Sequence, residues 1–175
     1  ADLYEKFKAG RLQLHTAKDD VLLNREIHRR LLKDTLVEDP NVVYLYWDIE
    51  SNGLNPYIDP LLELSWSKNL DPIEEHIARS NIPPSEKVLN KLFPDAEDKV
   101  AAYYNRFGNA KETEAEVLLK FLQDILQLQA QNKKVILVGH NLKDFDIRFI
   151  KTRLELLAQN DATLKALIEA PEYRR

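Results

Sequence analysis

The fold is decided by the stretch NVVYLYWDIE, residues 41–50. An apolar run of this length, rich in β-branched and aromatic residues, is typical of a strand that is buried on both faces. The sequence SNGLNP follows at once and breaks the strand, because its Asn, Gly and Pro residues favour a turn. We therefore expect a central buried strand over residues 42–50 that ends in two acids.

Strands and helices alternate around this central strand. Apolar and β-branched runs bounded by turn residues predict further strands at 61–67, 73–78 and 133–139. Apolar residues spaced three and four apart, together with capping residues, predict helices at 20–37, 85–92, 113–131, 144–159 and 162–169. Strands interleaved with helices indicate an α/β layer fold.

Composition and charge exclude several classes of protein. The 175 residues include 25 Lys and Arg against 29 Asp and Glu, with 44% hydrophobic residues and no cysteine. A chain without cysteine has no disulfide framework and no Cys-type zinc site, and its net charge of −4 disfavours a basic nucleic-acid coat. No apolar run approaches the ~18 residues of a membrane span, and the first ten residues lack a signal-peptide pattern. We expect a cytoplasmic protein with no membrane partner.

Two carboxylates end the central strand, Asp48 and Glu50. Because strand side chains alternate, both project to the same face, about 6 to 7 Å apart. If they emerge into solvent at the strand end, they need no function. If they stay buried, they need compensating charge, because an unpaired buried carboxylate costs several kcal/mol.

A third acid, Asp146, follows Gly139-His140-Asn141 at the junction of a predicted strand and helix. By itself it could serve only as a favourable charge near the start of that helix. Together with Asp48 and Glu50 it forms a set of three acids at the carboxyl edge of a sheet. Ligand sites in α/β folds gather at this edge.

Two motifs carry a resemblance to a known family. DIESNGL at residues 48–54 resembles the first motif of the DnaQ-like DEDD exonucleases, and VGHNLKDFDIRFI at residues 138–150 resembles the second. The resemblance implies a ribonuclease H-like α/β domain over residues 41–175, with a mixed sheet of about five strands flanked by helices. Residues 1–40 would form an N-terminal helical segment.

The family's third motif, His-x4-Asp at the start of a helix, normally follows the second. The residues after Asp146 contain no histidine, whereas HTAKDD at residues 15–20 has this spacing and opens a predicted helix. Three explanations stand side by side: a circular permutation that moves the motif to the N-terminus, a segment of a preceding domain, and a chance match. A helix of roughly 18 residues spans about 27 Å, which permits Asp20 to reach the edge with the other acids.

The resemblance also implies a mechanism. Four converging carboxylates require cations, and two Mg²⁺ or Mn²⁺ ions match hard oxygen ligands and a two-metal phosphodiester hydrolysis. By resemblance, Asp48 bridges both ions, Glu50 binds the one on the nucleophile side, Asp146 supports the leaving-group side and Asp20 completes the site. His15 would be the general base, a role suited to a group that titrates near neutrality.

The implied activity is 3′-to-5′ hydrolysis of single-stranded nucleic acid, with DNA favoured over RNA, that releases nucleoside 5′-monophosphates. The residues implied to contact the 3′-terminal nucleotide are Gly53, Leu54, His140, Asn141 and Phe145. Two alternatives remain: a non-catalytic binding or scaffold module with an incomplete third motif, and another two-metal phosphohydrolase on the same fold. A chelator separates an enzyme from a scaffold, because only the enzyme needs the metal.

Other polar and aromatic residues have two interpretations. Tyr103, Tyr104 and Arg106 could contact nucleic acid, although paired tyrosines more often pack inside a protein. His28 and Arg29 are expected on the solvated face of the first helix.

Overall fold

The computed structural model describes residue 5 and residues 16–33, 39–140 and 142–174. Within them, four strands form one mixed sheet in the order β3-β2-β1-β4. The central strand β1 (Val42–Ser51) pairs antiparallel with β2 (Leu61–Lys68) and parallel with β4 (Lys134–Val138), and β3 (Glu74–Ile77) pairs antiparallel with β2. The expected mixed sheet is confirmed. The described part of the chain holds four strands instead of about five, because every regular element after β4 is helical.

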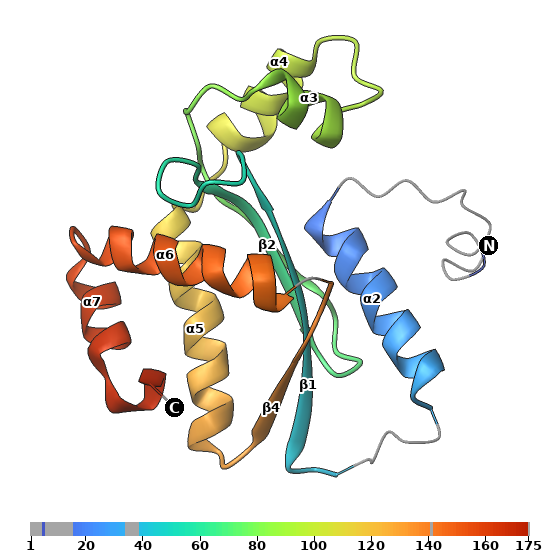
Figure 1. The fold of residues 1–175 in the computed structure, drawn as a ribbon, viewed down its shortest axis with the longest axis vertical. Helices are drawn as coiled ribbons and strands as arrows, with labels where there is room; N and C mark the ends of the chain where they lie inside the picture. The colour runs from blue at the N-terminus through green and yellow to red at the C-terminus, as the bar shows by residue number, and fades with distance from the viewer. Residues whose placement is uncertain (1–4, 6–15, 34–38, 141, 175) are drawn as a thin grey trace.

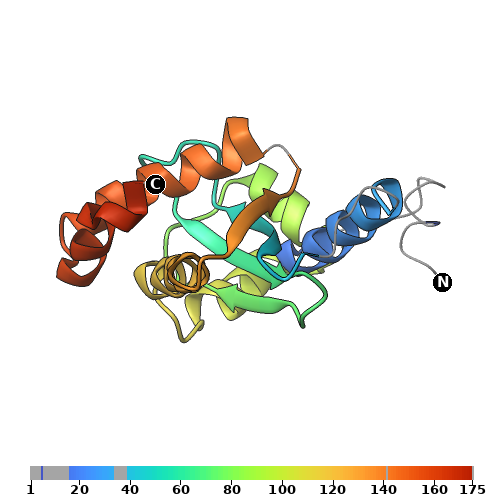
Figure 2. The same ribbon diagram turned by 90° about the horizontal axis from the view of Figure 1, so that it is seen from below.

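Helices cover both faces of the sheet (Figures 1 and 2). On one face lies α2, and on the other lie α5 and α6, with α7 outside them. Two short helices, α3 and α4, stand beyond one end of the sheet. The helix bounds are α2 Ala17–Leu31, α3 Glu86–Leu92, α4 Lys99–Tyr103, α5 Glu114–Ala130, α6 Ile147–Ala158 and α7 Ala162–Glu169; π-helical turns occupy η1 (Tyr104–Gly108) and η2 (Leu142–Asp146), and a 3₁₀ turn η3 (Pro171–Arg174). In the part of the chain that is described, no helix is long and apolar enough to cross a membrane.

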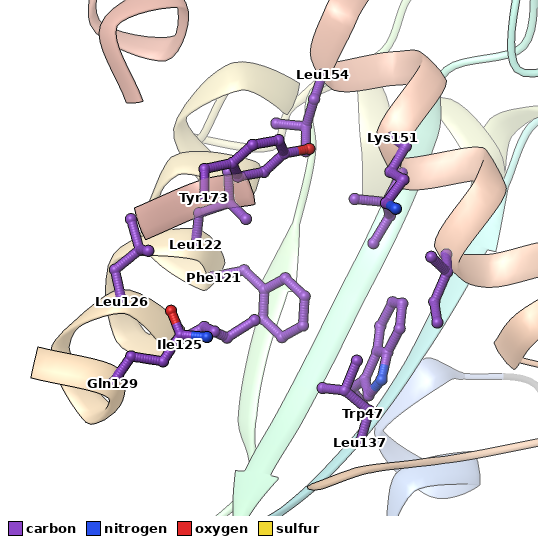
Figure 3. A pocket seen from close by; sticks show the side chains of 12 residues that line it. Trp47, Phe121, Leu122, Ile125, Leu126, Gln129, Leu137, Lys151, Leu154 and Tyr173 are labelled. Carbon is purple, nitrogen blue, oxygen red and sulfur yellow. The ribbon is translucent and has the colours of Figure 1, made fainter. Parts of the chain in front are cut away.

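The main core lies between the sheet and helices α5 and α6. Trp47 of β1 and Trp66 of β2 are opposite each other in the pairing register, and both rings contact Phe121 of α5 at centroid distances of 5.2 and 5.1 Å. The indole N–H of Trp66 donates to Asp124, 2.9 Å away. A cavity of about 190 Å³ lies beside Trp47 and is lined mainly by apolar side chains of α5 and α6. Figure 3 shows the side chains that line it. Both tryptophans therefore belong to this core.

The opposite face of β1 is covered by α2, which begins earlier and ends earlier than expected. Thr16 caps the helix, because its hydroxyl accepts the N–H of Asp19 at 3.1 Å, so helical residues start at Ala17 instead of Asp20. The helix ends at Leu31, and residues 34–38 of the expected helix lie outside the described residues.

The basic and aromatic side chains of α2 turn toward the sheet. Nδ1 of His28 lies 2.8 Å from the hydroxyl of Tyr46, and the guanidinium of Arg29 lies 5.8 Å from the centre of the Tyr46 ring. The expectation of a solvated face for His28 and Arg29 was wrong, because Tyr46 is fully buried and its hydroxyl needs a partner.

A buried carboxylate on β2 holds the start of α2. Glu63 is 1% exposed; it accepts the backbone N–H of Ala17 at 3.0 Å and the Nε–H of Arg106 at 2.6 Å. Tyr103, one turn before Arg106, is fully buried and donates to the carbonyl of Ile82 at 3.1 Å. The packing interpretation therefore holds for Tyr103 and Arg106. Glu63 connects the sheet, η1 and the first turn of α2.

We predict that Glu63→Ala destabilises the protein by about 3 kcal/mol, because it leaves a guanidinium and a helix N-terminus without their shared acceptor. Denaturant unfolding followed by circular dichroism measures this change. Glu97→Ala, at an exposed acid, is the matched control and should change stability by less than about 0.5 kcal/mol. Equal stability of the two variants would contradict the role given to Glu63.

Candidate active site

Acids from two separate elements meet at the end of β1. Asp48 and Glu50 lie on β1 and Asp20 lies in the first turns of α2, and each offers a carboxylate oxygen within 4.8 Å of those of the other two. Asp20 follows Ala17 by three residues, so it lies on the helix side that Glu63 holds against the sheet. Figure 1 shows α2 starting beside the end of β1 that carries the acids.

Asp146 joins the same site from the start of α6. It is 4% exposed, and its Oδ2 atom is buried without a hydrogen-bond partner among the described residues. Its charge raises the pKa of Asp48, so the two carboxyls lie in one electrostatic environment. Asp146 is not one of the three acids within 4.8 Å of one another. Its buried oxygen nevertheless has no donor among the described residues, and a cation or a proton would satisfy it.

Burial and mutual repulsion raise the pKa values of these acids. Loss of hydration raises the pKa of Glu50 to about 7 and that of Asp146 to about 7. The pKa of Asp48 lies well above its usual range because of burial and the charges of Asp20, Asp146 and Glu50. Burial also raises the pKa of Asp20, against a hydrogen bond with Asp48 that lowers it. The site therefore favours protons or cations over free negative charge.

One basic side chain already faces this charge. Lys91 of α3 places its Nζ 2.9 Å from Oε2 of Glu50, with the lysine 68% exposed and the glutamate 4% exposed. The ammonium also lowers the pKa of Asp20 and of Asp146, so it neutralises part of the whole cluster. Lys91 was not predicted from the sequence, because a lysine on a short helix carries no signal for a contact made through tertiary structure. Glu63 was not predicted either, although an acid inside the apolar run LLELSW was a usable signal.

The other residues expected at the site have different positions. His15 and Asn141 lie outside the described residues. His140 is exposed, and its charge lowers the pKa of Asp20, which indicates that the two side chains are near each other. Gly53 makes a close turn, since a Cβ there would lie 2.2 Å from Oδ2 of Asp59. Any larger residue at position 53 would displace that carboxylate.

Leu54 and Phe145 line one cleft, of about 420 Å³, between the loop after β1 and the start of α6. Leu54 is 72% exposed, and Phe145 is half-buried with its ring centroid 5.5 Å from that of Phe149. Phe145 directly precedes Asp146 in the chain, but the four acids are not among the described residues that line this cleft. The structure therefore has a cluster of carboxylates and a separate cleft lined by both apolar and polar side chains.

The family model for the exonuclease domain of family B DNA polymerases matches residues 25–167, a range that includes Asp48, Glu50 and Asp146 and leaves Asp20 outside. No curated protein matches the chain. The matched range covers most of the chain and all four strands of the sheet. With its acids on β1 and at the start of α6, the chain belongs to the exonuclease-domain family of the family B DNA polymerases, a DEDD-type 3′–5′ exonuclease domain of the ribonuclease H-like superfamily.

Proposed function

We propose that this chain is a metal-dependent 3′-to-5′ exonuclease that acts on single-stranded nucleic acid and releases nucleoside 5′-monophosphates. The observation that carries the proposal is the meeting of Asp20 from α2 with Asp48 and Glu50 from β1, beside the unpaired oxygen of Asp146. Acids from three elements share one buried site although their repulsion opposes folding. A purely structural cluster would gain nothing from that arrangement.

The residues present fit divalent cations. Carboxylate oxygens are hard ligands of the kind that Mg²⁺ and Mn²⁺ prefer, and four carboxylates balance two such ions. Asp20, Asp48, Glu50 and Asp146 would hold them. Bound there, the ions supply positive charge at the phosphodiester and activate water for attack on phosphorus.

The surrounding residues orient the substrate in this proposal. Leu54 and Phe145 contact the base of the 3′-terminal nucleotide from two walls of the cleft. Gly53 permits the close turn that brings Leu54 to this position. His140 is proposed to contact the same nucleotide, and so is Asn141, which follows it in the sequence. Apolar contacts of this kind accept any base, so DNA is favoured over RNA only by the family.

The position of Asp20 supports a permuted third motif. A chance His-x4-Asp match has no reason to bring its aspartate within 4.8 Å of two other predicted ligands. In this proposal residues 1–40 supply the third motif and residues 41–175 the rest of the exonuclease domain. His15, five residues before Asp20, is the general base.

We predict that Asp48→Ala abolishes metal-dependent cleavage of a single-stranded oligonucleotide while it raises the melting temperature of the metal-free protein. The ligand is lost, and so is part of the repulsion among the acids. Asp95→Ala, at an exposed acid, is the control and should retain activity. Cleavage by purified Asp48→Ala within a few-fold of wild type would refute the assignment, and so would wild-type cleavage that persists in a chelator.

The stability of the metal-free protein and the stabilisation by added metal should depend on pH in opposite directions. The pKa values of Glu50 and Asp146 are raised to about 7 in the folded protein. Both carboxyls therefore bind protons more tightly in the folded protein than in the unfolded chain. The metal-free protein should therefore be most stable near pH 4 and lose stability as pH rises to about 7. Saturating Mg²⁺ requires the ionised carboxylates, so its increase in melting temperature should be larger at about pH 8 than at about pH 5.5. A larger increase at the lower pH would show that the ions bind elsewhere.

The permuted motif predicts two different defects. His15→Ala should lower kcat by roughly 10²- to 10⁴-fold and leave the melting temperature and metal affinity unchanged, as expected for a general base. Asp20→Asn should weaken metal binding, measured by calorimetry, and so lower activity at limiting metal. Asp19→Asn, at the neighbouring helix position, is the matched control. Normal kcat in His15→Ala would remove the histidine from the mechanism and leave the assignment of Asp20 to be decided by calorimetry.

A further inference from the structure

The basic partners of the buried glutamates differ in how firmly they are held. Within the described residues, three buried glutamates each pair with one basic side chain, in the pairs Glu63–Arg106, Glu114–Arg153 and Glu50–Lys91. The two arginine side chains are 29% and 12% exposed, whereas the lysine side chain is 68% exposed. An arginine meets a carboxylate with a rigid fork of donors, and a lysine meets it with a single charge on a flexible stem. Glu50 is therefore the buried glutamate whose partner is held least firmly.

Lys91 reaches Glu50 from a helix whose backbone is anchored. The hydroxyl of Ser85 caps α3 by accepting the N–H of Val88 at 3.3 Å, and Val88 is buried together with Leu92 in a small apolar cluster. Figure 1 shows α3 beyond the same end of the sheet at which α2 begins. Breaking the contact with Glu50 therefore requires only a rotation of the lysine side chain, most of which is already in water.

The charge of Lys91 acts on more than one acid. Burial raises the pKa values of Glu50, Asp20 and Asp146, and the lysine charge lowers each of them. In the part of the chain that the structure describes, the pair with Lys91 is the only ion pair that an acid of this cluster makes. One positive charge is less than four ionised carboxylates require, so the cluster keeps capacity for further cations.

The ammonium of Lys91 and a divalent cation would compete for Glu50. The Nζ atom lies 2.9 Å from Oε2 of the glutamate. A Mg²⁺ ion bound to that oxygen at about 2.1 Å would lie within about 5 Å of the ammonium. Two cations this close repel each other strongly where the protein partly excludes water. Of the two, the ammonium can leave for solvent, because its side chain is exposed and flexible.

We propose that Lys91 is an exchangeable counter-cation, which pairs with Glu50 until a divalent cation binds the acids and then turns away into solvent. This inference rests on the proposed function for the metal site, although it does not require cleavage. The lysine stabilises the folded protein when no metal is bound, and the same interaction weakens metal binding. Lys91 therefore sets the metal concentration at which the site fills.

Metal affinity is the first test. Titration of the full chain with Mn²⁺, followed by the electron paramagnetic resonance signal of the free ion, gives the dissociation constant. Lys91→Gln should bind Mn²⁺ about 10- to 100-fold more tightly, the range expected when one hydrogen bond to a charged group no longer competes. Lys91→Arg keeps the charge and should bind close to wild type. Lys87→Gln, at an exposed lysine one turn earlier on α3, is the matched control and should change the constant by less than about twofold.

The melting temperature is the second test, and it distinguishes exchange from a fixed ion pair. In chelator, Lys91→Gln should melt below wild type, because the buried carboxylate of Glu50 loses its partner. At saturating Mn²⁺ the two proteins should melt at the same temperature, because the tighter binding of the variant offsets the lost pair. A lysine that stays on Glu50 would instead leave the variant less stable both with and without the ion.

The outcomes separate this inference from the exonuclease assignment. If wild type binds Mn²⁺ and cleaves, but Lys91→Gln binds the ion no more tightly, the exchange is wrong and the exonuclease stands. A difference in melting temperature that persists at saturating Mn²⁺ also overturns the exchange. If both tests succeed but wild type never cleaves, the exchange stands and the exonuclease assignment fails. If wild type binds no Mn²⁺, both are wrong.

Discussion

Repulsion among the carboxylates of Asp20, Asp48, Glu50 and Asp146 is the constraint on which the rest of the structure depends. These groups are buried together, and their raised pKa values express the free energy that opposes their ionisation. Such a cluster persists only when the surrounding fold holds it in place. The tryptophan-rich core on the opposite face of β1 provides that rigidity, since Trp47 directly precedes Asp48 in the same strand.

Other charges make the acidic cluster compatible with folding. Lys91 neutralises part of it directly. Glu63 acts indirectly, because it holds the first turn of α2, and with it Asp20, against the sheet. Glu63 in turn is paired with Arg106. Glu63 is thus neutralised by an arginine of its own, whereas Lys91 neutralises only part of the charge of the cluster of Asp20, Asp48, Glu50 and Asp146.

The packing of α2 explains how Asp20, which precedes β1 in the chain, lies beside the acids of β1. The sheet places β1 and the start of α6 together through the parallel pairing of β1 with β4. The helix α2 reaches this edge independently, because it packs across β1 and β2 with its N-terminus at the acids. A site built from side chains of three elements requires only that their ends meet in space, so chain order is free to vary. The loop between β1 and β2 then borders the cleft in which a strand of nucleic acid would lie.

The sequence by itself determined the elements and three of the acids. Residues 41–50 specified a buried strand through their β-branched and aromatic side chains, Thr113 and Ser85 specified helix starts, and alternation placed Asp48 and Glu50 on one face. These are local properties, governed by backbone periodicity and capping. Only the tertiary structure decided that Asp20 joins them, that Lys91 neutralises Glu50 and that Glu63 holds α2, because these contacts join residues 28 to 46 positions apart. No local pattern encodes such contacts; they arise when the packing of α2 and α3 brings the side chains together.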